Sequence, residues 1–499
     1  MKFTRSAGVI LHPTSLPGPD GIGDLGPEAY QWVNFLKAAG FGLWQILPLG
    51  PTGYGDSPYQ AFSAFAGNPY LVSAALLLDS DLLTGEDLSD RPAFPQERVE
   101  YGEVIQWKLK LLERAFARFK ASGSPALRAE LAAFQTREAA WLDDFALFMA
   151  IKEAQGGVSW DQWPEPLRNR QVKALTAFRR DNPDAIQRHI FRQFLFFRQW
   201  QELRAYANAQ GIKIIGDIPI FVAYDSAEVW AHPELFYLDE QGKPTVVAGV
   251  PPDYFSPTGQ LWGNPLYRWD VHQQSGYAWW IERVRAALNL VDILRVDHFR
   301  GFAGYWEVPA GMKTAEFGRW VPGPGASLFE AIRAGLGSLP IIAEDLGEIT
   351  PDVIELRDLL ELPGMKVMQF AFNGDPHHPF LPHNYPVNCV AYTGTHDNDT
   401  TVGWYQSASE AERDFCRRYL ARSGEDIAWD MLRAAWASAA AMTLAPLQDF
   451  LSLGSSARMN QPGRPHGNWT WRMDGEVFSN DALIARMMEL NFLYGRAAT

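Results

Sequence analysis

Ile293-Leu-Arg-Val-Asp297-His-Phe299 is an apolar run that ends in charged residues, and it holds the strongest single indication of the fold. In a strand, Arg295 and Asp297 would point to the same side, because side chains alternate along a strand. A short, almost uninterrupted apolar run is typical of a strand buried on both faces, as in parallel sheets. We therefore interpret Val291–Val296 as such a strand, with Asp297 at its carboxyl end.

Seven other short apolar runs have the same texture, and helical patterns separate many of them. Alternation of this kind predicts an α/β fold with a parallel sheet. Periodicity alone leaves both an open sheet and a closed barrel possible. The other expected strands are Val9–Leu11, Leu43–Leu49, Ile212–Ile215, Pro340–Ala343, Val367–Phe372, Val390–Thr393 and Leu444–Phe450. The expected helices between them include Glu28–Ala39, Tyr277–Leu288, Ala326–Ala334 and Ile427–Ala441.

A long, mostly helical stretch interrupts the alternation after the second expected strand. Val99–Lys120, Pro125–Gln155 and Ala185–Ala209 have the charged, amphipathic texture of surface helices. We therefore expect residues 70–205, approximately, to form a helical insertion on a single α/β body that spans residues 1–499.

The composition favours a neutral ligand. A net charge of −14 argues against nucleic acid or an anionic membrane as the main partner. The chain carries 19 Trp, 17 Tyr and 30 Phe, and aromatic faces pack well against the C–H faces of sugars, although most aromatic residues of a large fold are simply buried. Cys389 and Cys416 form no disulfide framework, and no signal peptide or membrane-spanning run is evident, so we expect a cytoplasmic protein.

Two other motifs are explained better by structure than by chemistry. Gly21-Ile-Gly-Asp-Leu-Gly26 matches a dinucleotide fingerprint, but it follows a proline-rich loop instead of a strand, so we interpret it as a structural loop. His377 and His378 lie between prolines, and no matching ligand spacing accompanies them. We expect no metal ion and no cofactor.

Four acids follow buried apolar runs: Asp217, Asp297, Glu344 and Asp397. A single acid after a strand is usually a helix cap, but parallel strands bring their carboxyl ends to one rim, where four acids would crowd together. Such crowding shifts pKa values and suits two-carboxylate glycoside chemistry, in which one carboxylate attacks and a protonated acid assists the leaving oxygen. Glu344 would then need a raised pKa. Phosphoryl transfer through Mg²⁺ also uses clustered acids, but the chain has no phosphate-cradling glycine loop.

The chain resembles the amylomaltases, which are 4-α-glucanotransferases (disproportionating enzymes) of glycoside hydrolase family 77 in the α-amylase clan. The resemblance extends from Leu11-His-Pro-Thr-Ser15 to Arg464-Pro-His-Gly-Asn-Trp469. It rests on Gly216-Asp-Ile-Pro-Ile-Phe221, Arg295-Val-Asp-His298, Ala343-Glu-Asp-Leu-Gly347 and Thr395-His-Asp-Asn-Asp399, and Asp56-Ser-Pro-Tyr59, Asp253-Tyr-Phe-Ser256 and Gly263-Asn-Pro-Leu266 make it specific to amylomaltases. It implies a (β/α)₈ TIM barrel with inserted, largely helical subdomains and no separate C-terminal β domain. It also implies an active-site loop insertion over residues 235–270, approximately.

The resemblance assigns a role to each acid. Asp297 is expected to be the nucleophile, Glu344 the general acid/base, and Asp397 the group that stabilises the transition state. The expected substrate-binding residues are Arg295, His396, Asp217, Tyr59, Tyr254, Phe255, Trp262 and Asn468. Tyr54 and Tyr101 resemble the aromatic pair of a secondary glucan site, although two ordinary tyrosines fit equally well.

The expected reaction is a retaining double displacement that transfers α-1,4-glucan segments to the 4-hydroxyl of another glucan or of glucose, or to the far end of the same chain. The expected partners are maltooligosaccharides, amylose, glycogen-derived chains and glucose, with no nucleic acid and no membrane, and we expect a monomer. Three alternatives remain open on the sequence: a hydrolytic α-glucosidase or amylase, a catalytically inactive glucan-binding protein, and a metal-dependent phosphotransferase.

Overall fold

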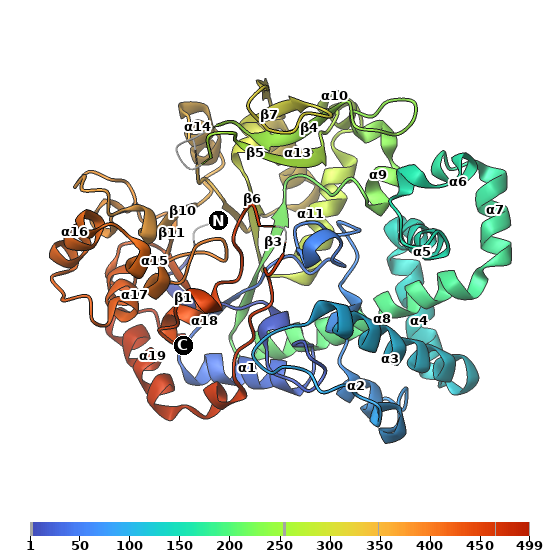
Figure 1. Cartoon of the computed structure of the whole chain (residues 1–499), viewed down its shortest axis with the longest axis horizontal. Coiled ribbons are helices and arrows are strands. Elements are labelled where there is room, and N and C mark those ends of the chain that lie inside the picture. The colour runs from blue at the N-terminus through green and yellow to red at the C-terminus, as the bar shows by residue number, and fades with distance from the viewer. Residues whose placement is uncertain (1–2, 253–255, 348, 465, 499) are drawn as a thin grey trace.

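The computed structural model describes residues 3–252, 256–347, 349–464 and 466–498. Eight parallel strands form one sheet in which neighbours follow in chain order and the last strand returns to pair with the first. The ring closes where the Ala343 N–H donates to the Pro363 carbonyl at 3.0 Å. The expected (β/α)₈ barrel is confirmed. Its strands are β1 (Ser6–Ile10), β2 (Leu43–Gln45), β3 (Lys213–Pro219), β6 (Ile293–Asp297), β9 (Ile341–Ala343), β10 (Gly364–Val367), β11 (Cys389–Tyr392) and β12 (Met442–Pro446). Figure 1 labels five of them, β1, β3, β6, β10 and β11, in the inner part of the molecule.

Strand alternation divides the core into two layers. One buried cluster fills the barrel with a side chain from every strand, among them Ile215, Ile293 and Ile342. The alternate positions, such as Ile214 and Leu294, face outward and pack against the surrounding helices. Arg295 and Asp297 follow Ile293 by two and four residues along β6. The same alternation therefore directs their side chains to the barrel axis.

Helices cover the outside of the barrel strands. α1 shows why: Pro27 is tolerated in its first turn, where its missing N–H leaves no bond unmade, and Trp32, Val33 and Leu36 are buried at helical spacing. The helices that lie outside the segment between β2 and β3 are α1 (Pro27–Ala38), α9 (Ala227–Ala231), α10 (Trp269–Gln274), α11 (Ala278–Leu290), α12 (Arg300–Ala303), α13 (Ala326–Leu336), α14 (Pro351–Leu359), α15 (Thr401–Ser407), α16 (Glu410–Leu420), α17 (Ile427–Ala437), α18 (Leu447–Phe450) and α19 (Asp481–Leu493).

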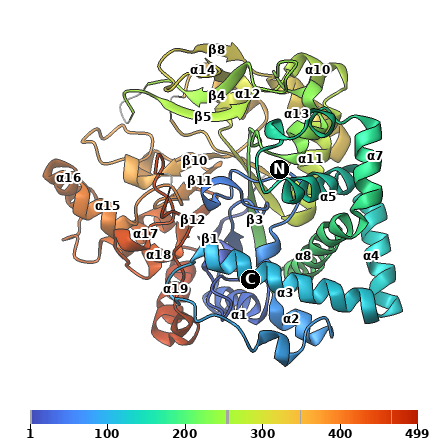
Figure 2. The ribbon, with the colours of Figure 1, turned by 45° about the vertical axis from the view of Figure 1, so that its right-hand side comes forward.

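Seven helices lie between β2 and β3, and Figure 2 shows α3, α4, α5, α7 and α8 beside the barrel. The stretch Pro125–Gln155, expected as one helical unit, is two helices that meet at Glu138, whose backbone leaves the helical region (φ −98°, ψ 12°). The Trp200 indole N–H donates to the Leu290 carbonyl at 2.9 Å and ties this group to α11. The seven are α2 (Ala74–Asp79), α3 (Tyr101–Ser122), α4 (Pro125–Arg137), α5 (Ala139–Ala154), α6 (Glu165–Arg168), α7 (Val172–Asp181) and α8 (Pro183–Ala209).

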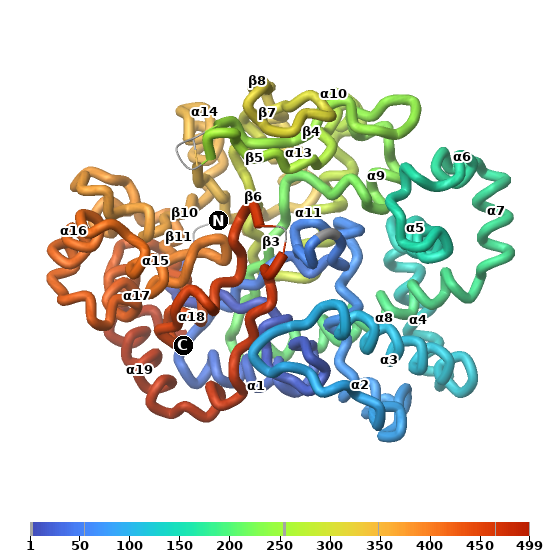
Figure 3. The backbone as a smooth tube through the Cα atoms, viewed as in Figure 1, coloured from blue at the N-terminus to red at the C-terminus, as the bar shows by residue number. Residues whose placement is uncertain are grey.

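A second, antiparallel sheet of four strands lies beyond the barrel, at the top of the view in Figure 3. The sequence patterns did not predict it, because two of its strands come from residues 304–322, outside the expected insertion at 235–270. Its strands are β4 (Val246–Val250), β5 (Gln260–Pro265), β7 (Gly304–Pro309) and β8 (Arg319–Pro322). The division of the chain into one barrel domain and two insertions stays a prediction.

Three expected strands end at least four residues earlier than predicted, and the first of them, Leu43–Leu49, is a strand only to Gln45. Val367–Phe372 is a strand only to Val367, after which Met368–Phe370 forms a 3₁₀ helix, and Leu444–Phe450 is a strand only to Pro446, where α18 begins. Apolar side chains continue past the last two of these ends because the chain stays buried while it turns at the rim of the barrel. None of the described helices is long and apolar enough to cross a membrane.

Candidate active site

Arg295 lies at the centre of the acidic rim. Its side chain is 3% exposed, its Nη2 donates to Asp297 Oδ1 at 2.9 Å, and its Nη1 donates to Asp217 Oδ2. Although burial disfavours its charged form, the two carboxylates raise the pKa of Arg295 well above its ordinary value. The guanidinium therefore stays charged and holds the carboxyl ends of β3 and β6 together.

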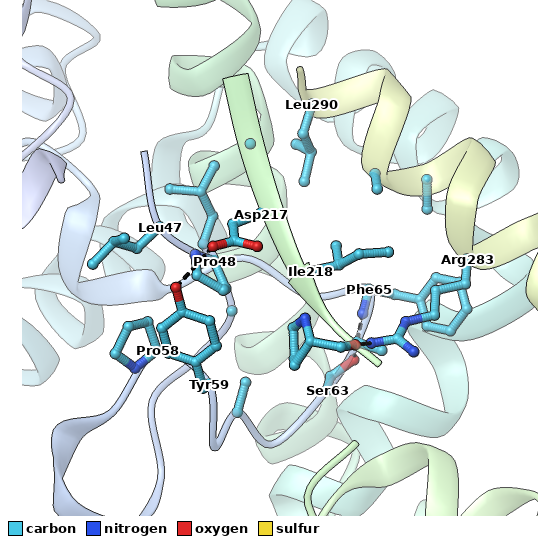
Figure 4. A pocket seen from close by; sticks show the side chains of 18 of the residues that line it. Leu47, Pro48, Pro58, Tyr59, Ser63, Phe65, Asp217, Ile218, Arg283 and Leu290 are labelled. Atoms are coloured by element: carbon cyan, nitrogen blue, oxygen red, sulfur yellow. Dashed lines mark hydrogen bonds between the residues drawn. The ribbon is translucent and has the colours of Figure 1, made fainter. Parts of the chain in front are cut away.

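Tyr59 also holds Asp217, at the same carboxylate oxygen that Arg295 contacts. The Tyr59 hydroxyl donates to Asp217 Oδ2 at 2.8 Å and lies 2.9 Å from His396 Nε2, and Figure 4 shows Tyr59 and Asp217 joined by the first of these bonds. The rings of Tyr59 and His396 are stacked, with centroids 5.2 Å apart. Burial raises the pKa of Asp217 to about 6, against the opposing effect of Arg295. Tyr59 thus links β3 to the loop that follows β11.

Glu344 follows directly after β9 and is 8% exposed. Its two oxygens accept the backbone N–H groups of His298 at 2.7 Å and Leu346 at 3.0 Å. Burial and then the negative charge of Asp297 raise the pKa of Glu344 to about 8, while Arg295 and the His298 amide oppose the shift. At neutral pH this carboxyl group therefore holds a proton, which a general acid must do.

Asp397 is the most accessible of the three central acids, with a side chain that is 46% exposed. The Asn460 amide donates to its Oδ1 at 2.6 Å, and His396 Nε2 lies 3.4 Å from its Oδ2. Partial loss of contact with water opposes ionisation, but His396 and the Asn460 hydrogen bond hold the pKa of Asp397 well below its usual range. Asp397 in turn raises the pKa of His396, against the effect of burial. Asp397 is therefore ionised at neutral pH, where Glu344 is not.

These groups adjoin an open cleft of about 350 Å³. Asp297, Asp397, Tyr59 and Trp262 line it, and the carboxyl group of Glu344 lies against the backbone of His298, which also lines it. The Trp262 ring meets the His298 ring edge-on, with centroids 4.7 Å apart. Carboxylates beside broad apolar faces form a site with the chemistry to bind and cleave a sugar chain.

Three non-glycine residues of the cleft loops have left-handed backbone: Asp56 (φ 56°), His298 (φ 54°) and Trp469 (φ 63°). Such conformations cost free energy and persist where the surrounding structure requires them. At His298 the turn aims the backbone N–H at Glu344, so the strained residue orients the proposed acid.

The structure brings nine of the predicted residues together. Asp217, Arg295, Asp297, His396, Asp397, Tyr59 and Glu344 form one hydrogen-bonded or charge-coupled group, and Trp262 and Asn468 line the same cleft. Asn468 accepts from the Gln461 N–H at 2.9 Å and donates to the Arg464 carbonyl at 2.9 Å, so its amide also shapes the loop that carries it.

The roles expected of the remaining predicted residues stay predictions. Tyr254 and Phe255 lie outside the described residues, as does the side chain of Tyr54. Tyr101 is 8% exposed and its hydroxyl donates to the Trp469 carbonyl at 2.9 Å, which connects α3 to the wall of the cleft. The secondary glucan site stays a prediction.

Three residues of the site were not predicted from the sequence: Asn460, Arg458 and Trp469. Arg458 donates to the Asp397 carbonyl at 2.6 Å, and the Trp469 ring lies 5.9 Å from both the Tyr59 and the His396 ring. Asn460 and Arg458 lie on a loop about sixty residues after Asp397, and nothing in their own sequence pattern marks them. Among the described residues, no group of three or more His, Cys, Asp or Glu side chains is placed to hold a metal ion.

Comparison with known proteins agrees with this geometry. A family model described as 4-alpha-glucanotransferase matches residues 11–478. The 4-alpha-glucanotransferases of Thermus thermophilus and Synechocystis sp. are 56% and 51% identical to this chain, over 98% and 99% of its length and 99% of theirs. The amylomaltase from Streptococcus agalactiae, solved in complex with acarbose, is 41% identical, with a TM-score of 0.96 over 99% of this chain and all of that one. These similarities extend over almost the full length of every chain compared.

Proposed function

This chain belongs to the 4-alpha-glucanotransferase family, and from that premise we propose that it transfers glucan segments by double displacement through Asp297 and Glu344. The observation that supports this most directly is the burial of Glu344 beside Asp297, which raises the pKa of Glu344 to about 8, while Asp297 accepts a hydrogen bond from Arg295. A retaining glycosidase mechanism needs one nucleophilic carboxylate and one protonated acid, and this rim supplies both.

In the first step, Asp297 attacks the anomeric carbon of an α-1,4-linked glucose, and a β-glucosyl-enzyme bond forms as the glycosidic bond breaks. Glu344 gives its proton to the departing oxygen. Asp397, ionised and fixed by Asn460, stabilises the positive charge that develops on the sugar ring. Arg295, which also donates to Asp217, holds the Asp297 carboxylate at the end of β6.

In the second step, Glu344 takes the proton from the 4-hydroxyl of an incoming glucan or glucose, which attacks the glucosyl-enzyme and regenerates both an α-1,4 bond and free Asp297. When the acceptor is the far end of the same chain, the product is a large cyclic glucan. Transfer exceeds hydrolysis when the acceptor sugar occupies the cleft more productively than water, and broad rings such as Trp262 favour the sugar.

The test of transfer is the product distribution from maltotriose alone. We expect glucose together with maltooligosaccharides longer than the substrate, resolved by chromatography, and no net rise in reducing ends. Glucose and maltose accompanied by a steady rise in reducing ends would instead indicate hydrolysis.

Asn460 offers a test of the role of Asp397. In Asn460→Ala the Asp397 carboxylate loses a 2.6 Å charge-assisted hydrogen bond. Such a bond contributes about 1.5–3 kcal/mol, so we expect kcat/KM for maltotriose to fall roughly tenfold to a hundredfold. Asn388→Ala is the matched control, because that exposed amide donates to the Glu361 carbonyl away from the cleft. Unchanged kinetics in Asn460→Ala would contradict the proposed support of Asp397.

We also propose that the protein works as a cytoplasmic monomer. Cys389 and Cys416 are both buried free thiols, which fits a reducing compartment. Size-exclusion chromatography with light scattering tests the monomer directly.

A further inference from the structure

Asp345, the residue after Glu344, occupies the join at which the barrel closes. β9 and β10 stand at the two ends of the hydrogen-bonded strand order, so the ladders that unite the other strands do not extend between them. Asp345 is 4% exposed, and its Oδ1 accepts the Met365 N–H of β10 at 2.7 Å. Its side chain therefore takes the place of a ladder hydrogen bond between these two strands.

Arg357 holds the other oxygen of the same carboxylate. Its Nη1 donates to Asp345 Oδ2 at 2.6 Å from α14, the helix that follows the loop after Glu344. A Cβ on Gly364 would lie 2.3 Å from Asp345 Oδ2, so only glycine leaves room for the carboxylate at this position. The Met365 N–H of β10, Arg357 of α14 and the glycine at position 364 therefore all accommodate the carboxylate of Asp345, which is next to Glu344 in the sequence.

The backbone of Glu344 is held on its other side by β6. Its N–H donates to the Val296 carbonyl, and its carbonyl accepts the Phe299 N–H, at 3.1 and 3.0 Å. The Glu344 main chain is therefore fixed between β6 on one side and, through Asp345, β10 and α14 on the other. Proton transfer requires the donor to be held within a fraction of an ångström of its productive position.

The charges around the two acids come from several elements. Asp297 and Arg295 of β6 face Glu344, while Arg357 of α14 and Lys366 of β10 face Asp345. The negative charge of Asp345 also raises the pKa of Glu344, although its effect is smaller than those of burial, Asp297 and Arg295.

We propose that Asp345 is a positioning residue for Glu344: it closes the β9–β10 join through Met365 and Arg357 and so fixes the geometry of proton transfer. This inference rests on the role proposed for Glu344. Asp345 itself touches no substrate, and its loss acts only through its neighbour.

The test is Asp345→Asn, which keeps the shape and an acceptor for the Met365 N–H but removes the negative charge. With maltotriose we expect kcat to fall roughly tenfold to a hundredfold with KM changed by less than about threefold. The alkaline limb of the kcat/KM profile should move to lower pH, because an anion next to Glu344 is gone. A glucosyl fluoride donor, whose leaving group needs no proton, should retain its burst of fluoride release.

Asp414→Asn is the matched control, because Asp414 pairs with Arg418 on the exposed face of α16. Arg357→Met provides a second variant: it leaves the bond to Met365 intact, so it should fold and lose part of the same kcat if Asp345→Asn does not fold. The proposal would be overturned if the folded variants kept wild-type kcat and an alkaline limb of kcat/KM at the wild-type pH. It would also be overturned if the variants lost as much activity with the glucosyl fluoride donor as with maltotriose. Full maltotriose turnover by Glu344→Gln would instead overturn the role of Glu344, so the two failures are distinguishable.

Discussion

Asp297→Asn is expected to abolish glucan transfer, with kcat reduced by a factor on the order of 10⁴ or more. In the wild-type protein Arg295 Nη2 lies 2.9 Å from Asp297 Oδ1. The asparagine amide has nearly the same shape and its oxygen can still accept this hydrogen bond, so substrate binding and folding should survive. What it loses is the negative oxygen that attacks the anomeric carbon. Steady-state rates with maltotriose measure the loss, and mass spectrometry of quenched wild-type enzyme should detect a glucosyl adduct that the variant lacks.

Asp184→Asn is the control for this substitution. Asp184 is an exposed acid at the start of α8 that pairs with Lys120, far in sequence from the strand ends, and its replacement should leave kcat unchanged. An Asp297→Asn variant that keeps more than about a tenth of wild-type turnover would exclude a covalent role for Asp297. The catalytically inactive alternative raised by the sequence makes the opposite prediction, since neither variant would then differ from wild type.

The parallel strands could be predicted from the sequence because they are buried on both faces, whereas the closed barrel was expected only from the family resemblance. All eight expected runs correspond to barrel strands, although two of them continue into helical turns at the rim. Closure could not be predicted from periodicity, since the join between β9 and β10 depends on the Asp345 side chain and one backbone bond to Pro363. The small antiparallel sheet was not predicted, because β8 is a short strand of four largely exposed residues and carries no buried apolar pattern.

Some residues of the active site could likewise be predicted from the sequence, and others could not. Asp297 and Glu344 could be found because each follows a buried run directly, and parallel strands bring such positions to one rim. Asn460 and the backbone N–H of His298 could not, because their contribution depends on where a loop folds back and on one left-handed residue. Tyr101 lies between the two cases: its aromatic character was visible in the sequence, but its bond to Trp469 was not.

Glu344→Gln is the second substitution with a large expected effect. Glutamine cannot donate an acidic proton to the leaving oxygen, and general acid catalysis contributes about 10²–10⁴-fold, so kcat with maltotriose should fall by that range. In wild type, kcat/KM should decline as pH rises through about 8, where Glu344 loses its proton. That alkaline limb should be absent from the residual activity of the variant. A limb that persists unchanged in Glu344→Gln would assign the titration to another group.

The same substitution should make the folded protein more stable at alkaline pH. The pKa of Glu344 is raised from 4.5 to about 8 on folding, so the buried carboxyl costs nothing below pH 4.5, destabilises progressively between these values, and reaches its full cost above about 8. A tenfold change in an acid dissociation constant corresponds to about 1.4 kcal/mol of free energy. Glutamine carries no such cost, so the Tm of Glu344→Gln relative to wild type should increase from pH 5 to pH 8 and then level off. Glu240→Gln, on an exposed turn, should show no such trend. A Tm difference that is independent of pH would mean that Glu344 is already ionised in the folded enzyme, and Glu344 could then not be the proton donor of the first step.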